Sequence, residues 1–358
     1  MSDTAEPDTL VVETVERLLA DVCTPASVER AESVGWSAAV WDALVNAGFP
    51  WVSVPVDAGG SGGTLADAAA ILRCVGRHAA PVPIAETGVL AGWLLAGAGI
   101  ELPAGPATVV PDASAITLVD GRLIGRATVA WGRRAERIVA LVANGSDWIV
   151  ASCRPEQLSI TLGQSLAGEP RDRVWFDVPL VATEHAPALP GTDGDALHHR
   201  GAFTRVVMTA GALSAIAQMT IDYTNERQQF GRPVATFQAV QQHLVTVAQC
   251  AVRVEMAADL ATRAIARGAV GIEIAAARLI ADAAIVAGTR AAHQAHGAMG
   301  VTREYPLHQL SRRLWAWRHE YGSATTWRRR LGRDVHAGGA DALFPLITGW
   351  VAHDSVRP

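Results

Sequence analysis

Two segments of the chain concentrate side chains that could bind a ligand. They supply an arginine, an aromatic ring, two amides and two glycines: Arg227, Phe230, Gly231, Gln238, Gln294 and Gly297. An arginine presents a planar fork of donors that matches a carboxylate or a phosphate, and a glycine lets a ligand approach where a Cβ would obstruct it. Simpler roles compete with ligand binding: Arg227 could cap a helix or pair with an acid, Phe230 could belong to the core, and Gly297 could form a tight turn.

Metal and disulfide chemistry are not indicated by the cysteines. Cys23, Cys74, Cys153 and Cys250 are widely separated, and no two of them form a CxxC pair. We therefore expect no metal site and no disulfide framework, and we predict buried, reduced thiols.

The composition is that of a soluble globular protein. Half of the 358 residues are apolar, 18% are charged, and the formal net charge is -5. There is no long basic run, which argues against nucleic acid or an anionic membrane as the main partner. The local cluster of Arg328, Arg329, Arg330 and Arg333 is interpreted as a solvated or ion-paired helix face.

Targeting and membrane segments are not predicted either. Residues 1–8 are acidic and lack the basic and apolar stretches of a signal peptide. The apolar run from Gly88 to Ile100 is too short to span a bilayer. The expected location is the cytoplasm.

The elements that must position these side chains begin with N-terminal helices. Apolar residues recur at every third or fourth position in Val11–Leu19 and Trp41–Phe49, as an amphipathic helix requires. Proline and glycine interrupt the pattern over residues 54–63, and a further helix is expected from Leu65 towards His78. We assign residues 1–105 to a helical N-terminal domain.

A small antiparallel β domain is predicted over residues 106–190. Apolar runs flank Asp120-Gly121, a favoured two-residue hairpin turn, and a second pair of runs flanks residues 144–147. The segment 174–178 is expected to form a further strand.

The last third of the chain is predicted to be helical again. Phe237, Val240, Leu244, Val247 and Ala251 fall on one stripe of a long helix. Ile272–Gly288 and Pro306–Leu331 are expected to form two more helices. Long antiparallel helices of this kind form a bundle, which we assign to residues 191–335, with a tail at 336–358. The fold class is therefore α+β.

Two stretches carry a more specific signal. Residues 223–233 read YTNERQQFGRP and are followed by FQAVQ, and residues 294–306 read QAHGAMGVTREYP. Both resemble signature stretches of the acyl-CoA dehydrogenase family, in the family's order and separation. The loop 48–60 and the segment 166–172 are also similar to family segments, so the resemblance covers about residues 10 to 335.

The resemblance implies a cofactor and a reaction. Members of the family hold FAD and remove two hydrogens from an acyl-CoA thioester: a carboxylate takes the α-proton and the flavin takes the β-hydride. Electrons then pass to an electron-transferring flavoprotein. By this resemblance Arg227 pairs with the FAD pyrophosphate of a neighbouring subunit, Phe230 packs against the adenine side and Gln238 bonds the ADP moiety. Gly231, Gln294 and Gly297 are further residues that the resemblance assigns to binding of the same cofactor.

Other parts of the family pattern are missing. The family's Thr-Glu-Pro…Gly-Ser-Asp segment before the β domain has no counterpart between Ala96 and Ala115, and its tryptophan-isoleucine-threonine strand corresponds at best to 129–132. These segments contact the flavin ring within one subunit. The resemblance therefore implies that this chain retains the contacts made across an interface better than those made in cis.

The position of the catalytic base also departs from the family. Ungapped counting places Tyr321 at the usual glutamate position, with Glu320 one residue away, and an alternative base position aligns with Thr204, which cannot abstract an α-proton. Glu320 is the candidate base. It could equally be an ordinary ion-paired residue, because its predicted helix also contains Arg312, Arg313 and Arg318.

The favoured hypothesis is a subunit that does not carry the base, as in bacterial α2β2 acyl-CoA dehydrogenases, several of which act on steroid-derived thioesters. Such a chain completes the FAD site of a second subunit. The alternatives are a self-sufficient homo-oligomeric dehydrogenase with Glu320 as base, a flavin-dependent oxygenase on the same fold, and a scaffold without flavin. Trp131, Trp315, Trp317 and Trp327 could line a pocket for a bulky acyl group or simply belong to the core.

Overall fold

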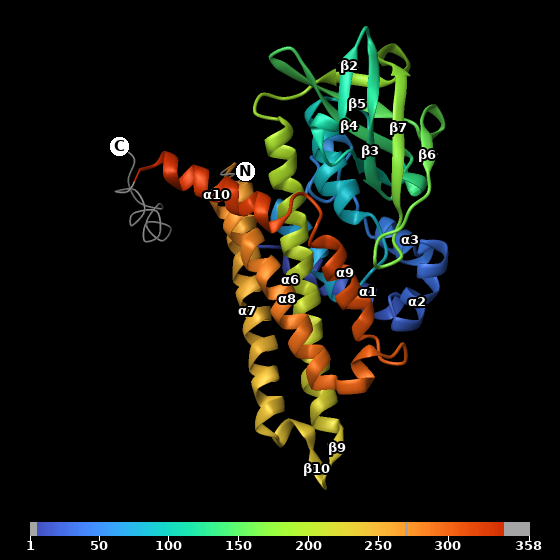
Figure 1. Cartoon of the computed structure of the whole chain (residues 1–358). Helices are drawn as coiled ribbons and strands as arrows, with labels where there is room; N and C mark the ends of the chain where they lie inside the picture. Colours follow the sequence, from blue (N-terminus) through green and yellow to red (C-terminus); the bar gives the residue numbers. More distant parts are fainter. Residues whose placement is uncertain (1–5, 269–270, 340–358) are drawn as a thin grey trace.

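The computed structural model describes residues 6–268 and 271–339, with helices towards both ends of this part and strands between them (Figure 1). The N-terminal elements are α1 (Thr9–Val22), α2 (Pro25–Val34), α3 (Ala38–Asn46), α4 (Leu65–Arg77), a π-helical segment (Ala85–Gly92) and α5 (Trp93–Gly97). Local chemistry fixes where α4 begins: Thr64 and Asp67 form a capping box that satisfies free backbone donors of the first turn.

The strands form two four-stranded sheets. The first has the order β1 (Ala107–Val109), β4 (Arg137–Asn144), β5 (Asp147–Cys153) and β8 (Glu184–Pro187), and the second has β2 (Ile116–Val119), β3 (Arg122–Ala130), β7 (Arg171–Pro179) and β6 (Ser159–Thr161). Apolar side chains of both sheets share one buried cluster. Both predicted hairpins are present, since Val119 pairs with Arg122 around Asp120-Gly121 and Asn144 pairs with Asp147.

One strand pairing differs from the expected antiparallel pattern. Ala107 lies opposite Arg137 in a parallel register, and the pairing continues to Val109. The chain reaches this register because β2, β3 and their hairpin lie between the two strands in sequence and supply the crossover that parallel strands need.

The C-terminal helices are α6 (Gly194–Glu226), α7 (Gln238–Ala266), α8 (Ile272–His296), α9 (Leu307–Trp317) and α10 (Ala324–Ala337). A two-stranded turn, β9 (Gln228–Gln229) and β10 (Arg232–Pro233), joins α6 to α7 at the far end of the bundle from the sheets (Figure 1). On α7 the predicted stripe is mostly half-buried, and the fully buried face begins at Val247 and continues through Cys250 and Val254.

The prediction of one helix over Pro306–Leu331 is wrong. The chain leaves the helix after Trp317 and begins α10 at Ala324, with Tyr321 and Gly322 at φ values of 51° and 96°. Helical backbone cannot contain these left-handed conformations. Residues 340–358 of the predicted tail lie outside the described residues.

Helix α6 is the central element of the bundle. It is long and apolar enough to pass a composition test for a membrane span, but most of that stretch is buried between other helices. The four cysteines are buried and unpaired, as predicted. Burial raises the pKa of Cys23, Cys74 and Cys153 to about 12, so these thiols are protonated at neutral pH.

Candidate functional site

The β9–β10 turn presents an aromatic ring to solvent. Phe230 and Gly231 form the turn with φ values of 53° and 78°, and the Phe230 side chain is 91% exposed. The prediction that Phe230 could belong to the core is therefore wrong. Among the described residues its one aromatic neighbour is Phe237, at 6.1 Å between ring centroids, and Arg232 lies over the Phe237 ring at 4.3 Å.

Two polar side chains flank this turn. Arg227 is the C-cap residue of α6 and Gln238 is the first residue of α7, and both are exposed. The Arg227 backbone N–H donates to the carbonyl of Tyr223, while its guanidinium has no carboxylate within 4 Å in the part of the chain that is described. The guanidinium is therefore available to an anion from outside the chain.

The second predicted segment lies at the same end of the bundle. Gln294 is exposed in the last turn of α8, and Gly297 ends the helix at φ 60° with no atom within 4 Å of the place where a Cβ would be. The Tyr223 ring stacks on the His296 ring at 4.6 Å, which holds the end of α8 against the end of α6.

Together these residues fit an extended, anionic and aromatic ligand. They offer a free guanidinium, two amides, an exposed ring and open backbone at a glycine, all on one exposed end of the bundle. The structure brings together all six residues predicted to bind FAD, and it separates them from Glu320.

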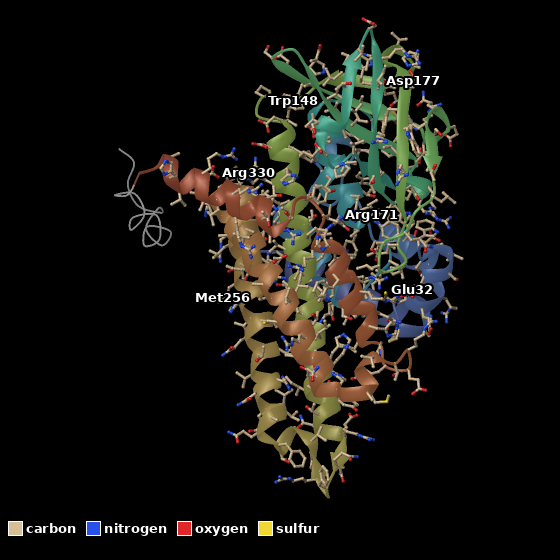
Figure 2. The ribbon with its side chains drawn as sticks, in the orientation of Figure 1. Glu32, Trp148, Arg171, Asp177, Met256 and Arg330 are labelled. Atoms are coloured by element: carbon tan, nitrogen blue, oxygen red, sulfur yellow. The ribbon has the colours of Figure 1, made fainter. Side chains whose placement is uncertain are left out.

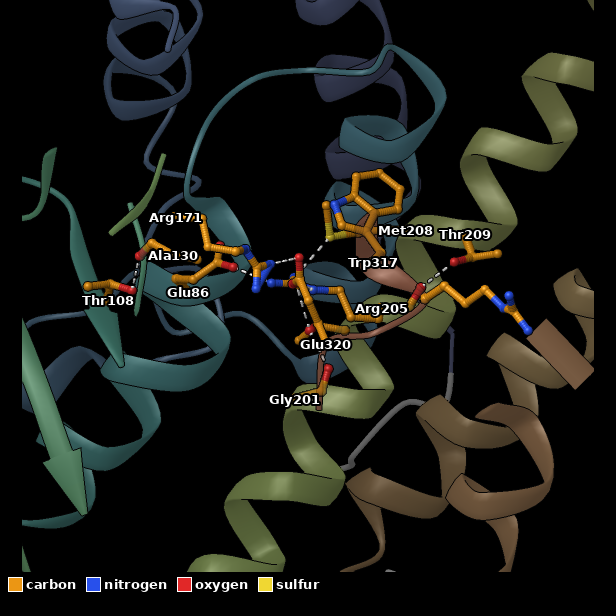
Figure 3. Close-up of polar contacts among 12 residues, drawn as sticks. Glu86, Thr108, Ala130, Arg171, Gly201, Arg205, Met208, Thr209, Trp317 and Glu320 are labelled. Atoms are coloured by element: carbon orange, nitrogen blue, oxygen red, sulfur yellow. Dashed lines mark hydrogen bonds and ion pairs between the residues drawn. The ribbon is translucent and has the colours of Figure 1, made fainter. Parts of the chain in front are cut away.

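Glu320 belongs to a buried ion network at the junction of the helices and the sheets (Figure 3). Its carboxylate accepts a hydrogen bond of 2.5 Å from Arg205 on α6 and forms an ion pair with Arg171 on β7. Arg205 also pairs with Glu86 of the π-helical segment. The Arg205 and Glu86 side chains are 2% and 3% exposed, so the charges are largely removed from water.

A further ion pair extends this network. Arg313, which is fully buried, binds Glu169 at 2.8 Å. Burial raises the pKa of Glu169, although Arg313 opposes that shift. Burial likewise opposes the charge of Arg205, but Glu86 and its neighbours outweigh it and raise the pKa of Arg205. The cavity left among these side chains measures about 10 Å³, room for one water at most.

Glu320 is not on a helix, in contrast to the prediction. It lies in the turn after α9, where its backbone carbonyl accepts a hydrogen bond from Arg278 at 3.2 Å. Tyr321 follows it and is buried with its ring against Gly201 of α6. Thr204, the alternative base position, is fully buried and donates to the carbonyl of Gly201.

Of the two roles considered for the tryptophans, the structure favours the core. Trp131, Trp317 and Trp327 are 5%, 3% and 0% exposed, and Trp315 is half-buried beneath the guanidinium of Arg318. The arginine cluster of α10 is partly ion-paired, as interpreted, because Arg330 binds Asp195 at the start of α6.

Sequence reasoning missed Arg205, which binds Glu320, and Glu86, which binds Arg205. Arg205 interrupts the apolar run 201–213 of α6, and Glu86 stands among apolar residues before Gly88. A charge within an apolar segment is a signal of a buried ion pair, and it could have identified both residues although not their pairing.

An apolar stripe runs along the outer side of α7. Val245, Val252, Met256 and Leu260 are between 47% and 61% exposed, and their spacing of seven, four and four residues places them on one helix face. Met256 points away from the rest of the bundle (Figure 2). A stripe of this kind is typical of a helix that packs against another protein chain.

Comparisons with known proteins identify the family to which both ends of the chain are similar. Residues 196–336 match the family model described as acyl-CoA dehydrogenase, C-terminal domain, and residues 5–101 match the N-terminal domain of the same family. The chain is 29% identical over 315 residues to acyl-CoA dehydrogenase IpdE2 of Mycobacterium tuberculosis, covering 84% of this chain and 88% of that protein.

Two solved structures share the fold. A chain of the ChsE4-ChsE5 complex from Mycobacterium tuberculosis superposes with a TM-score of 0.80 at 22% identity, covering 94% of this chain and 98% of that one. A chain of the Tcur3481-Tcur3483 steroid acyl-CoA dehydrogenase superposes with a TM-score of 0.83 at 23% identity, covering 93% and 98%.

Proposed function

Because the chain belongs to the acyl-CoA dehydrogenase family, we propose that it is a subunit of an FAD-dependent enzyme that introduces an α,β double bond into an acyl-CoA thioester. The chain does not supply the base in this proposal. It contributes the exposed end of its bundle to FAD bound at an interface with a second acyl-CoA dehydrogenase subunit.

The observation that carries this proposal is the exposed end of the bundle. Arg227 pairs with the FAD pyrophosphate through its planar fork of donors, and Gln238 hydrogen-bonds the ADP moiety. Phe230 and Gly231 cover the adenine side, which explains why an aromatic ring is 91% exposed in the isolated chain. Gln294 and Gly297 allow a close approach from the neighbouring segment. When bound, the flavin supplies the hydride acceptor.

The ion network supports the assignment of the base to the partner. A general base must be free to accept a proton from the substrate, whereas the carboxylate of Glu320 is held by two guanidinium groups. A ligand pocket usually measures several hundred Å³, and the cavity beside Glu320 is about 10 Å³. A self-sufficient enzyme with Glu320 as base would require this network to open.

The remaining features fit a heteromeric enzyme. The apolar stripe of α7 supports a subunit interface. We propose that the enzyme is a heterotetramer, which contains two copies of each chain. We propose a steroid-derived acyl group, which the steroid acyl-CoA dehydrogenase among the structural neighbours supports. An electron-transferring flavoprotein is the proposed electron acceptor, and the cytoplasm is the proposed location.

The test is to purify this chain alone and together with an acyl-CoA dehydrogenase subunit encoded beside it. Visible absorption gives the flavin content, and light scattering gives the mass in solution. We expect about one flavin per two chains, and only in the mixed complex. One flavin per chain in the protein alone would overturn the proposal and would make Glu320 the first residue to mutate.

A further inference from the structure

A groove of about 860 Å³ lies on the N-terminal helices, and none of its lining residues belongs to the exposed end of the bundle or to the ion network. Its wall combines α5, the loop after α3, the segment before α6 and one residue of α6 itself. Most of its side chains are apolar or small, and the larger apolar ones are Val54, Pro55, Trp93, Ile100 and Leu189.

Arg200 is the cation of this groove. Its Nε donates a 2.7 Å hydrogen bond to the carbonyl of Val89 in the π-helical segment, and its guanidinium lies over the Trp93 ring at 4.8 Å. These two contacts fix the orientation of the guanidinium before any ligand arrives. The hydrogen bond to Val89 uses Nε, and among the described residues no hydrogen bond occupies the two terminal nitrogens, which can bind a carboxylate in bidentate fashion.

The charge of Arg200 is not neutralised by the chain. No carboxylate lies within 4 Å of it among the residues described, in contrast to the buried Arg205, which has two. Burial lowers the pKa of Arg200 to about 10, so the half-buried guanidinium is still charged at neutral pH and is only partly removed from water. A partly desolvated cation without a counter-ion is unfavourable, and an anion from solution would reduce that cost.

Two acidic side chains limit which anion would suit the groove. Asp57 and Glu101 also line it, without approaching Arg200 to ion-pair distance. They would repel a doubly charged phosphate more strongly than a singly charged carboxylate. The volume and the apolar wall match a small amphipathic molecule rather than a macromolecule.

We propose that this groove is a second ligand site, which binds an amphipathic monocarboxylate with its acid group on the terminal nitrogens of Arg200. The apolar body of the ligand lies along Trp93, Val54 and Leu189. The site is separate from the proposed FAD contacts: Arg200 and Arg227 lie at opposite ends of α6, about 40 Å apart at 1.5 Å per residue.

The first experiment measures binding of decanoate to the full chain, in its complex where one forms, by titration calorimetry. Decanol is the matched neutral probe, and inorganic phosphate is the matched anion without an apolar body. We expect decanoate to bind more tightly than decanol or phosphate. The substitution Arg200→Gln should lower the affinity for decanoate at least about tenfold. Arg122→Gln is the control, because this exposed arginine pairs with Asp177 on the sheets.

A stability measurement keeps the proposal testable if binding is weak. Arg200→Gln removes an uncompensated charge together with its contacts to Val89 and Trp93, so the melting temperature of each protein is compared with and without decanoate. The increase that decanoate causes in the wild type should be absent from the variant. Equal decanoate binding in wild type and Arg200→Gln, or no binding to the wild type, would overturn the proposal. Flavin content is measured in the same samples, so a failure of the FAD proposal is recognised separately.

Discussion

The carboxylate of Glu320 accepts a 2.5 Å hydrogen bond from Arg205, and both side chains are almost completely buried. The two residues are 115 positions apart in sequence and connect the turn after α9 to the centre of α6. Glu86, on the other side of Arg205, connects the same pair to the N-terminal helices. Glu320, the candidate base, is therefore part of a structural junction in this chain.

Glu320→Gln should reduce stability rather than turnover. The substitution leaves Arg205 and Arg171 without their shared anion, and breaking a buried ion pair in this way costs about 3 kcal/mol or more. Urea unfolding of the complex measures this loss, and Glu156→Gln on the exposed surface is the control. A thousandfold loss of turnover with unchanged unfolding would instead identify Glu320 as the base.

Arg227→Gln should lower the FAD content of the complex at least tenfold. The substitution removes a charged fork that has no partner within the described chain, so folding should be unaffected while the pyrophosphate loses a charge-assisted contact. The complex is dialysed to remove flavin and then titrated with FAD, and the change in visible absorbance gives its affinity for FAD. Arg122→Gln, which removes another exposed arginine, is the matched control and should keep its FAD. Retention of full FAD content by Arg227→Gln would contradict the assignment of the exposed end to the cofactor.

The sequence was sufficient to predict elements that local signals determine. Asp120-Gly121 identified its hairpin because both turn residues adopt positive φ, and the three-to-four periodicity identified the long helices. The six candidate FAD residues were identified by resemblance, and the chain brings them to one end because α6 ends, α7 begins and α8 ends there.

The elements that were missed depend on contacts distant in sequence. Helical periodicity continues through residues 318–323, and the break there is accompanied by the packing of Tyr321 against Gly201. The parallel pairing of β1 with β4 depends on a crossover rather than on a turn. The ion network joins Glu86, Arg205 and Glu320, and no local pattern specifies which buried acid meets which buried base.

Met256→Glu should weaken the assembly without unfolding the chain. Met256 is 61% exposed on the apolar stripe of α7, so a carboxylate there is solvated in the free chain but desolvated in an interface. Sedimentation of the Met256→Glu variant should show that the complex dissociates at micromolar protein concentrations. Val181→Glu, at a residue that is 90% exposed beside β7, is the control. An unchanged mass for Met256→Glu would exclude this face from the interface.

His198 should make the protein sensitive to mild acid. Burial lowers the pKa of His198 to about 4, and Arg330 and His199 add to the effect. In the unfolded chain the histidine pKa is near 6.5, so between pH 6.5 and 4 the unfolded state binds more protons than the folded state. The free energy of unfolding therefore falls as pH decreases through that window, by about 3 kcal/mol at pH 4. His198→Asn should flatten this dependence, as measured by urea unfolding at several pH values. An equally steep dependence in the variant would assign the effect to other groups.

Gly201→Ala tests the contact that accompanies the break between α9 and α10. In a helix interior, replacing glycine by alanine usually stabilises by about 0.5–1 kcal/mol. At Gly201, however, the new Cβ would lie 2.1 Å from the Tyr321 ring, so the ring and the adjoining Glu320 must move. We expect a net destabilisation of about 1–3 kcal/mol, as for an overpacked core.

Gly332→Ala provides the matched control, because this glycine is also helical and a Cβ there meets no atom within 4 Å. Gly332→Ala should raise the free energy of unfolding by about 0.5–1 kcal/mol, as is usual in a helix interior. Opposite signs for the two substitutions, measured by urea unfolding, would establish that Tyr321 packs on α6 as described. A stabilising Gly201→Ala would instead mean that the turn carrying Glu320 is displaced from α6 in solution, and Glu320 would then be free of Arg205.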